Sequence, residues 1–211
     1  MRVAVIVATQ AEAAFLRGLD LSVFVSGIGA VNAALTAAEV IGRERPNLIV
    51  SAGIGGAYPS SGLRPGDVVV SSEIMYGGLG AMDGEHFLNL EELGFALHGE
   101  LFNRLPVWKD AGAWAAQAGA AFGPLLTLET VTGDDEVAGR LERRFPGALT
   151  EGMEGAGVAH AALRANVPCA EVRGVSNFVG RRDRGAWRVP EALAACRAAL
   201  LTLRMNFDMT L

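Results

Sequence analysis

Short, uninterrupted apolar runs are the feature that most limits the folds open to this chain. The first is Val3-Ala4-Val5-Ile6-Val7, and similar runs rich in Val and Ile recur along the sequence. Between them lie Ala-rich stretches in which apolar residues repeat at helical spacing. A strand that is apolar on both faces needs cover on both sides, which the parallel sheets of α/β proteins receive from helices. The pattern therefore predicts an α/β fold.

The predicted strands and helices alternate along the chain and suit one central sheet. Pro and Gly stand at most predicted helix ends, as in Pro146-Gly147. The predicted strands are Arg2–Ala8, Ser22–Ser26, Leu48–Ala52, Asp67–Met75, Leu125–Val131, Ala148–Met153 and Cys169–Ser176. The predicted helices are Ala11–Leu19, Ala30–Arg45, one within Asp110–Ala121, Asp134–Phe145, Glu154–Asn166 and Pro190–Arg204.

The segment Tyr76–Lys109 has no clean period and is predicted to be a long loop. It is rich in glycine at its start and then carries several aromatic residues. A long loop of this kind is more often functional than idle. The aromatic residues are Phe87, Phe95, Phe102 and Trp108.

Length and charge restrict the domain count and the partners. With 211 residues, the chain is long enough for one sizeable core but short for two, which predicts a single domain over residues 1–211. The 51% of apolar residues excludes a disordered chain. A formal charge of −5, with 18 Lys and Arg and no basic stripe, does not predict the positively charged surface of a nucleic-acid-binding protein. A small-molecule partner is therefore expected.

The apolar run at the N-terminus and the cysteines point to a cytoplasmic protein without a membrane partner. The run reaches Gln10 and Glu12 too soon for a signal sequence or a membrane span. Cys169 and Cys196 lie in different apolar segments without metal-ligand spacing. They are predicted to be buried free thiols, which suits a reducing cytosol.

Two glycine clusters follow predicted strands. Ser26-Gly27-Ile28-Gly29-Ala30-Val31-Asn32 is like a dinucleotide fingerprint, but Asn32 replaces the third glycine and no acidic residue ends a strand about 20 positions later. The second cluster, Gly53-Ile54-Gly55-Gly56-Ala57, is predicted to form a turn whose backbone approaches a ligand, or a tight turn without one. Neither has the Lys-Ser/Thr of a P-loop, so no nucleotide cofactor is expected.

Three polar residues lie where predicted strands end, which is where open α/β sheets present ligand groups. Glu12 follows the first strand, although a first-turn helix carboxylate would also suit that position. Glu154 stands between Met153 and Gly155, and Asn177 ends the last strand. If they converge, the two carboxylates could serve a sugar and the amide a base, so that together they would hold a nucleoside.

The ordered motifs resemble those of the methylthioadenosine/S-adenosylhomocysteine nucleosidases over most of the chain. The resemblance implies a three-layer phosphorylase/nucleosidase-like fold with a central mixed β-sheet flanked by helices. It also implies a homodimer or homotetramer, hydrolysis of the bond between a purine and a ribosyl carbon, and no metal. The motifs are Glu12, Ser26-Gly27-Ile28-Gly29, Gly53–Ala57, Gly66-Asp67-Val68-Val69-Val70, Phe145-Pro146, Met153-Glu154-Gly155 and Val172-Arg173-Gly174-Val175-Ser176.

The same resemblance implies roles for individual residues. Glu12 matches the carboxylate that activates water, and Glu154 with Met153 matches the pair that holds the ribose hydroxyls. Asn177 replaces the Asp of the adenine-cleaving enzymes. An amide donates to a 6-oxo group and accepts from a protonated N7, which predicts hypoxanthine. Ile54 replaces a Ser of those enzymes, so the local contact to water differs.

The string Arg173–Arg184, followed by Trp187, is similar to the C-terminal signature of futalosine hydrolases. Futalosine carries hypoxanthine, and its hydrolysis belongs to an alternative route to menaquinone. Its 5′ side bears a carboxyphenyl ketone, which would suit apolar walls and a cation. Candidate walls are Tyr76, Phe87 and Phe95, unless these aromatics only form a small core of the loop. Candidate cations are Arg181, Arg182 and Arg184, unless these form a solvated face.

The leading hypothesis is therefore a futalosine-cleaving N-glycosyl hydrolase with catalytic Glu12 and Asn177. An adenine-specific nucleosidase is disfavoured by Asn177, and a phosphorylase by the lack of a cation from Glu12 up to Arg17. A non-catalytic nucleoside-binding protein would not need both carboxylates. The candidate substrate-binding residues are Gly53, Ile54, Gly55, Val131, Thr132, Met153, Glu154 and Arg184.

Overall fold

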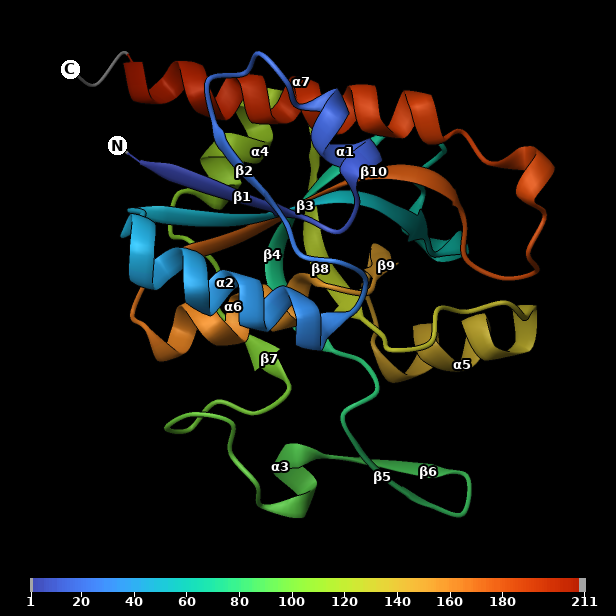
Figure 1. Ribbon diagram of the computed structural model, residues 1–211. Helices are drawn as coiled ribbons and strands as arrows, with labels where there is room; N and C mark the ends of the chain where they lie inside the picture. Colours follow the sequence, from blue (N-terminus) through green and yellow to red (C-terminus); the bar gives the residue numbers. More distant parts are fainter. Residues whose placement is uncertain (1, 209–211) are drawn as a thin grey trace.

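A mixed β-sheet with helices on both sides forms the centre of the molecule (Figure 1). The computed structural model describes residues 2–208. The strands are β1 Val3–Val7, β2 Ser22–Val25, β3 Leu48–Ala57, β4 Val68–Tyr76, β5 Gly80–Asp83, β6 His86–Asn89, β7 Arg104–Leu105, β8 Ala121–Thr127, β9 Thr150–Gly152 and β10 Cys169–Phe178. The helices are α1 Gln10–Phe15, α2 Ala30–Glu44, α3 Leu90–Leu93, α4 Ala111–Ala118, α5 Asp135–Arg144, α6 Gly155–Arg164 and α7 Val189–Asp208, with short 3₁₀ turns η1 Pro59–Ser61 and η2 Arg184–Ala186.

The strand order makes the sheet close on itself. It runs β10-β4-β8-β9-β3-β1-β2, and β10 also pairs with β3. Five strands therefore form a ring, and β1 and β2 extend from it. β3 is parallel to β1 and β10 but antiparallel to β9, and β4 is antiparallel to β10. The predicted mixed sheet flanked by helices is confirmed.

The apolar run of β1 shows how the layers form. Val3, Val5 and Val7 pack with Trp114 of α4 and Leu200 of α7 in one cluster. Ala4 and Ile6, which point to the opposite face, pack with α2 and α6 in a second cluster. Because both faces of this strand are covered, the run needs no polar residue.

Two segments fold differently from their sequence prediction. Gly53–Ala57 is not a turn but the second half of β3, because β10 pairs along it and β9 pairs at Gly56 and Ala57. The predicted strand Leu125–Val131 is wrong at both ends, since β8 covers Ala121–Thr127. Pro124 lies inside β8 where the pairing with β4 is irregular, between Ser71 and Glu73. Such an irregularity lets a strand accept a proline, which has no N–H to donate.

The segment Tyr76–Lys109 is also more regular than the predicted loop. It contains the β5–β6 hairpin, the short helix α3 and the strand β7. Figure 1 shows the hairpin and α3 as an extension on the far side of α2 and α6. These elements span only two to four residues each, too few for a periodic pattern to identify them.

Both cysteines are buried and free, as predicted. Burial raises the pKa of the Cys196 thiol to about 11. Within residues 2–208, no helix combines the length and the apolar character needed to cross a membrane.

The close approach of α2 and α6 generates a stability prediction. A methyl group on Gly157 of α6 would collide with the backbone of Ala30, whereas one on Gly42 of α2 would meet no atom within 4 Å. We expect Gly157→Ala to lower the free energy of unfolding by about 1–3 kcal/mol, as overpacking does. The control Gly42→Ala should raise it by about 0.5–1 kcal/mol through helix propensity. Thermal melts that gave both variants the same gain would contradict the close helix contact.

Candidate active site

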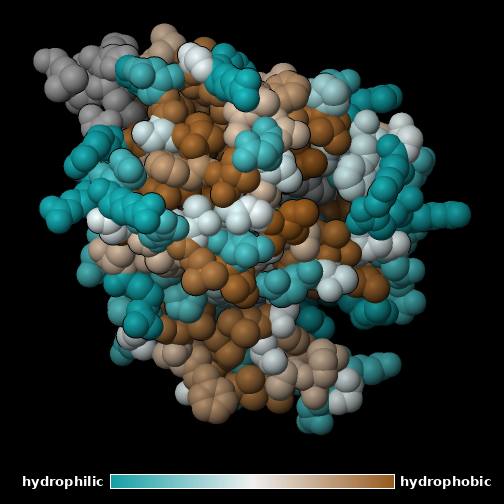
Figure 2. Space-filling view, viewed as in Figure 1, coloured by the Kyte–Doolittle hydropathy of each residue, from teal (hydrophilic) through white to brown (hydrophobic). Residues whose placement is uncertain are grey.

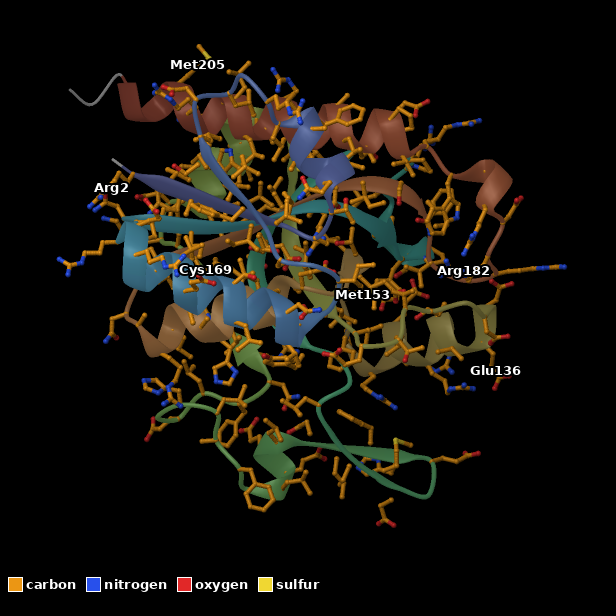
Figure 3. All side chains as sticks on the ribbon, viewed as in Figure 1. Arg2, Glu136, Met153, Cys169, Arg182 and Met205 are labelled. Carbon is orange, nitrogen blue, oxygen red and sulfur yellow. The ribbon has the colours of Figure 1, made fainter. Side chains whose placement is uncertain are left out.

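One cavity of about 370 Å³ brings together residues from the ends of β1, β3 and β10 and from the β9–α6 junction. Glu12, Glu154 and Asn177 all line it. Figure 3 shows Met153 and Arg182 at the end of the sheet where β10 turns toward α7. The full lining is Ala8, Thr9, Ala11, Glu12, Ile28, Ile54, Gly55, Gly56, Val131, Thr132, Glu151, Gly152, Met153, Glu154, Arg173, Ser176, Asn177, Gly180, Arg182, Trp187, Val189 and Leu193.

Glu12 is a buried carboxylate that is fixed by its own helix. It forms a capping box with Thr9, whose N–H and hydroxyl each donate to Oε2 at 2.9 Å. The other oxygen, Oε1, accepts from the N–H of Ile54 at 3.3 Å. A methyl group on Gly53 would lie 2.5 Å from that oxygen, so Gly53 gives Glu12 room rather than lining the cavity itself. The helix-capping role and the site position of Glu12 therefore coexist.

Glu154 is held from two sides at the start of α6. The N–H of Gly29 donates to Oε1 at 3.2 Å, and Arg173 Nη2 lies 3.1 Å from Oε2. Gly29 has a φ of +96°, a conformation that glycine adopts without strain. The first glycine cluster thus positions a carboxylate.

Arg173 connects the two sides of the site, although its side chain is only 2% exposed. Its Nε donates to Glu171 Oε1 at 2.7 Å, and Nη2 donates to Ser51 Oγ at 3.2 Å. Burial alone would lower the pKa of Arg173, but Glu171 and Glu154 outweigh this and raise it. Burial raises the pKa of Glu171, while Arg173 opposes the shift. An arginine inside an apolar strand run is the sequence signal that could have marked this residue.

Asn177 reaches the cavity through an irregularity in β10. Val175 pairs with Gly55, and Asn177 pairs with Gly56, so Ser176 is an extra residue in the strand. Such a bulge changes the direction in which the next side chain points. The amide accepts from Ser176 Oγ at 2.7 Å and donates to the carbonyl of Phe178 at 2.8 Å. Each end keeps the capacity for one more hydrogen bond.

Glu151 is a cavity residue that the sequence analysis missed. It is 4% exposed and accepts from the N–H of Thr132 at 2.6 Å, the hydroxyl of Thr132 at 2.8 Å and that of Tyr58 at 2.9 Å. Burial and the nearby Glu151 raise the pKa of Tyr58, which therefore stays protonated. Glu151 lies within a predicted strand, and the sequence offered no signal that its side chain faces the site.

Of the other candidate substrate-binding residues, some line the cavity and others do not. Ile54, Gly55, Val131, Thr132 and Met153 line it. Arg184 does not; it lies exposed in η2, where the Asp183 carboxylate accepts from the N–H of Gly185 and fixes the turn. Arg182 lines the cavity instead, 5.2 Å from the centre of the Trp187 ring.

The three candidate wall aromatics lie elsewhere. The Tyr76 hydroxyl is 3.3 Å from His160 Nδ1, and Phe87 packs under the guanidinium of Arg144 at 4.3 Å. Phe95 is exposed. The apolar walls of the cavity are formed by other residues, which are Ala8, Ile28, Val131, Trp187, Val189 and Leu193.

Comparison with known proteins identifies the superfamily to which this chain belongs. The family model of the Phosphorylase superfamily matches residues 5–204. Solved structures of 5′-methylthioadenosine/S-adenosylhomocysteine nucleosidases share the fold. The enzyme from Colwellia psychrerythraea, in complex with adenine, has a TM-score of 0.83 at 24% identity and covers 97% of this chain and 95% of its own. That from Streptococcus pyogenes has a TM-score of 0.85 at 22% identity, covering 98% and 97%. The chain belongs to the Phosphorylase superfamily.

Curated relatives identify the family of the chain within the superfamily. A futalosine hydrolase of Streptomyces coelicolor is 47% identical over 87% of this chain and 77% of its own length. One of Acidothermus cellulolyticus is 42% identical, covering 86% and 74%. One of Thermus thermophilus is 36% identical, covering 92% of both. Within the superfamily, the chain therefore belongs to the futalosine hydrolase family.

The position of Arg173 between carboxylates generates a second prediction. Arg173→Met should lower the free energy of unfolding by about 3–5 kcal/mol, because Glu171 and Glu154 would stay buried without their cation. The double variant Arg173→Met/Glu171→Met should recover part of this loss. As a control, Arg43→Met removes an exposed helix pair with Glu39 and should change stability by less than about 1 kcal/mol. Denaturant titrations in which the two arginine variants lost equal stability would contradict the buried cation.

Proposed function

We propose that this chain hydrolyses the N-glycosidic bond of futalosine and releases hypoxanthine and dehypoxanthine futalosine, a step of menaquinone biosynthesis. The observation that carries the proposal is the 36–47% identity to futalosine hydrolases over most of the chain. The cavity adds a chemical argument, because it places an amide, Asn177, beside two carboxylates, Glu12 and Glu154.

Each of these residues has a role in the proposed reaction. As the bond between the ribosyl carbon and the purine nitrogen breaks, positive charge grows on the sugar, and Glu154 stabilises it by accepting from the ribose hydroxyls. Glu12 takes the proton of a water molecule whose oxygen bonds to the ribosyl carbon. The departing base takes a proton at N7 from solvent, and Glu12 returns to solvent the proton that it took from the attacking water, so that the step balances. Asn177 accepts from the N7–H and donates to O6.

Water suits this cavity better than phosphate as the nucleophile. Phosphorolysis needs cations that are free to bind an anion. Of the two arginines in the cavity lining, Arg173 is already paired with Glu154 and Glu171, and Arg182 is assigned here to the 5′ group of the substrate. A 5′-methylthioadenosine/S-adenosylhomocysteine nucleosidase of Colwellia psychrerythraea is 30% identical over 205 residues, which makes adenine nucleosides the second candidate substrates. Asn177 favours the 6-oxopurine.

Arg182 and Trp187 would suit the 5′ group of futalosine. An arginine can pair with the carboxylate of a carboxyphenyl group, and a tryptophan can stack on its ring. Both residues line the cavity, whereas Arg184 does not. Arg182→Gln should therefore raise KM for futalosine about 10-fold while leaving KM for inosine nearly unchanged. Equal effects on the two substrates would argue against a carboxylate contact.

We also propose a single domain that forms a homodimer or homotetramer through the start of α2. Val31 and Leu35 lie four residues apart on one face of α2 and are 69% and 66% exposed, and Ile28, just before the helix, is 59% exposed. Figure 2 shows apolar side chains along the middle of this view, between charged residues. Exposed apolar patches commonly mark protein contacts. Light scattering that gave the 22.0 kDa of one chain would contradict the oligomer.

The buried free cysteines support a cytoplasmic location for the proposed enzyme. Fractionation of the native cells, followed by immunodetection, tests this. Recovery of the protein outside the cytoplasm would contradict it.

Release of free base is the direct test of the activity. The purified chain, incubated without phosphate, should release hypoxanthine from futalosine faster than adenine from methylthioadenosine. Glu12→Gln should lower kcat by about 100-fold or more, because the amide cannot take a proton from water. Thr9→Ser keeps the hydroxyl donor to Glu12 and serves as the matched control. Turnover that needs phosphate, or that is unchanged in Glu12→Gln, would overturn the mechanism.

A further inference from the structure

Three neighbouring strands place a second polar residue beside Asn177. Gly56 of β3 pairs with Asn177 of β10 on one side and with Glu151 of β9 on the other. Residues that pair across neighbouring strands point to the same face of a sheet. Asn177 and Glu151 therefore stand on one face, about 10 Å apart at their Cα atoms, since strands lie about 4.8 Å apart.

The residue between them has no room for a side chain on this face. A methyl group on Gly56 would lie 3.0 Å from Val179 Cγ2 and 3.3 Å from Asn177 Nδ2, so these two side chains pack against its backbone. All three residues, Asn177, Gly56 and Glu151, line the cavity. The amide and the carboxylate therefore border the same cavity, with a residue between them that has no side chain.

Glu151 is held rigidly by three donors and lines the cavity with acceptor atoms only. Tyr58 and the Thr132 hydroxyl donate to Oε2, while Oε1 takes a single hydrogen bond, from the N–H of Thr132. A carboxylate oxygen accepts two hydrogen bonds, so Oε1 has room for a further donor. Buried carboxylates fixed in this way discriminate strongly between ligands that bring a donor and ligands that do not.

We propose that Glu151 reads the purine at N1 and sets the preference for a 6-oxopurine together with Asn177. This inference rests on the proposed function for the nature of the base. A 6-oxopurine carries a hydrogen at N1, next to O6, and can donate it to Glu151. A 6-aminopurine has a lone pair at N1, which a carboxylate repels. Asn177 hydrogen-bonds to O6 and N7, and Glu151 accepts a hydrogen bond from N1.

Binding of free bases tests this role separately from turnover. Calorimetry would compare hypoxanthine, adenine and 1-methylhypoxanthine, which has a methyl group where hypoxanthine has the N1 hydrogen. The wild type should bind hypoxanthine at least about 10-fold more tightly than either of the others. Glu151→Ala should bring the ratio of hypoxanthine to 1-methylhypoxanthine close to one, and Glu151→Gln should reduce it by about 10-fold.

Thr150→Val is the matched control, because it changes the neighbouring residue of β9, which lies outside the cavity lining and whose hydroxyl has no hydrogen-bond partner within residues 2–208. It should leave the ratio unchanged. A purely structural Glu151 would instead make both Glu151 variants weaken every base equally, which overturns the proposal. If Glu151→Ala does not fold, the binding ratio of Glu151→Gln alone tests the proposal. A wild type that binds hypoxanthine selectively but leaves futalosine intact defeats the proposed function and not this inference.

Discussion

The buried guanidinium of Arg173 is the interaction on which the rest of the site depends. It joins Ser51 and Ile54 of β3, Glu171 of β10 and Glu154 at the start of α6. Burying these charges is costly, and their mutual pairing offsets the cost only in good geometry. Glycines surround the network because side chains would not fit: Cβ atoms would crowd Arg173 at Gly152 and Gly53, and would overlap the Glu171 carboxylate at Gly155. Glycines at these three positions thus make room for the network around this cation.

Local sequence patterns predicted the parts of the fold that local physics determines. Helix ends marked by Pro and Gly and the apolar runs of β1 and β10 were found within a few residues of their bounds. Glu12, Glu154 and Asn177 were correctly placed at strand ends. The second half of β3 was missed because its glycines favour turns, and only pairing with β9 and β10, distant in sequence, makes them a strand.

The residues that the sequence could not assign depend on register and on turn geometry. Glu151 and Thr150 are neighbours in β9, and the local sequence does not indicate which of the two side chains faces the cavity. The pairing of Glu151 with Gly56 determines this orientation. Arg182 and Arg184 are two residues apart in one arginine-rich segment. Both side chains are exposed, but the stem of Arg182 packs over Gly133 and lines the cavity, whereas Arg184 in the η2 turn does not line it. Such choices arise in three dimensions and leave no periodic signal.

The bulge at Ser176 bears on how substrate preference can evolve on this fold. Because the extra residue, rather than the alternation of β10, sets the direction of position 177, the side chain there can be exchanged without moving the strand or its neighbours. The carboxylates Glu12 and Glu154 are anchored independently, through Thr9 and Arg173. Under the proposed function, a codon change at position 177 would therefore alter one of the groups that read the base while the carboxylates stay in place.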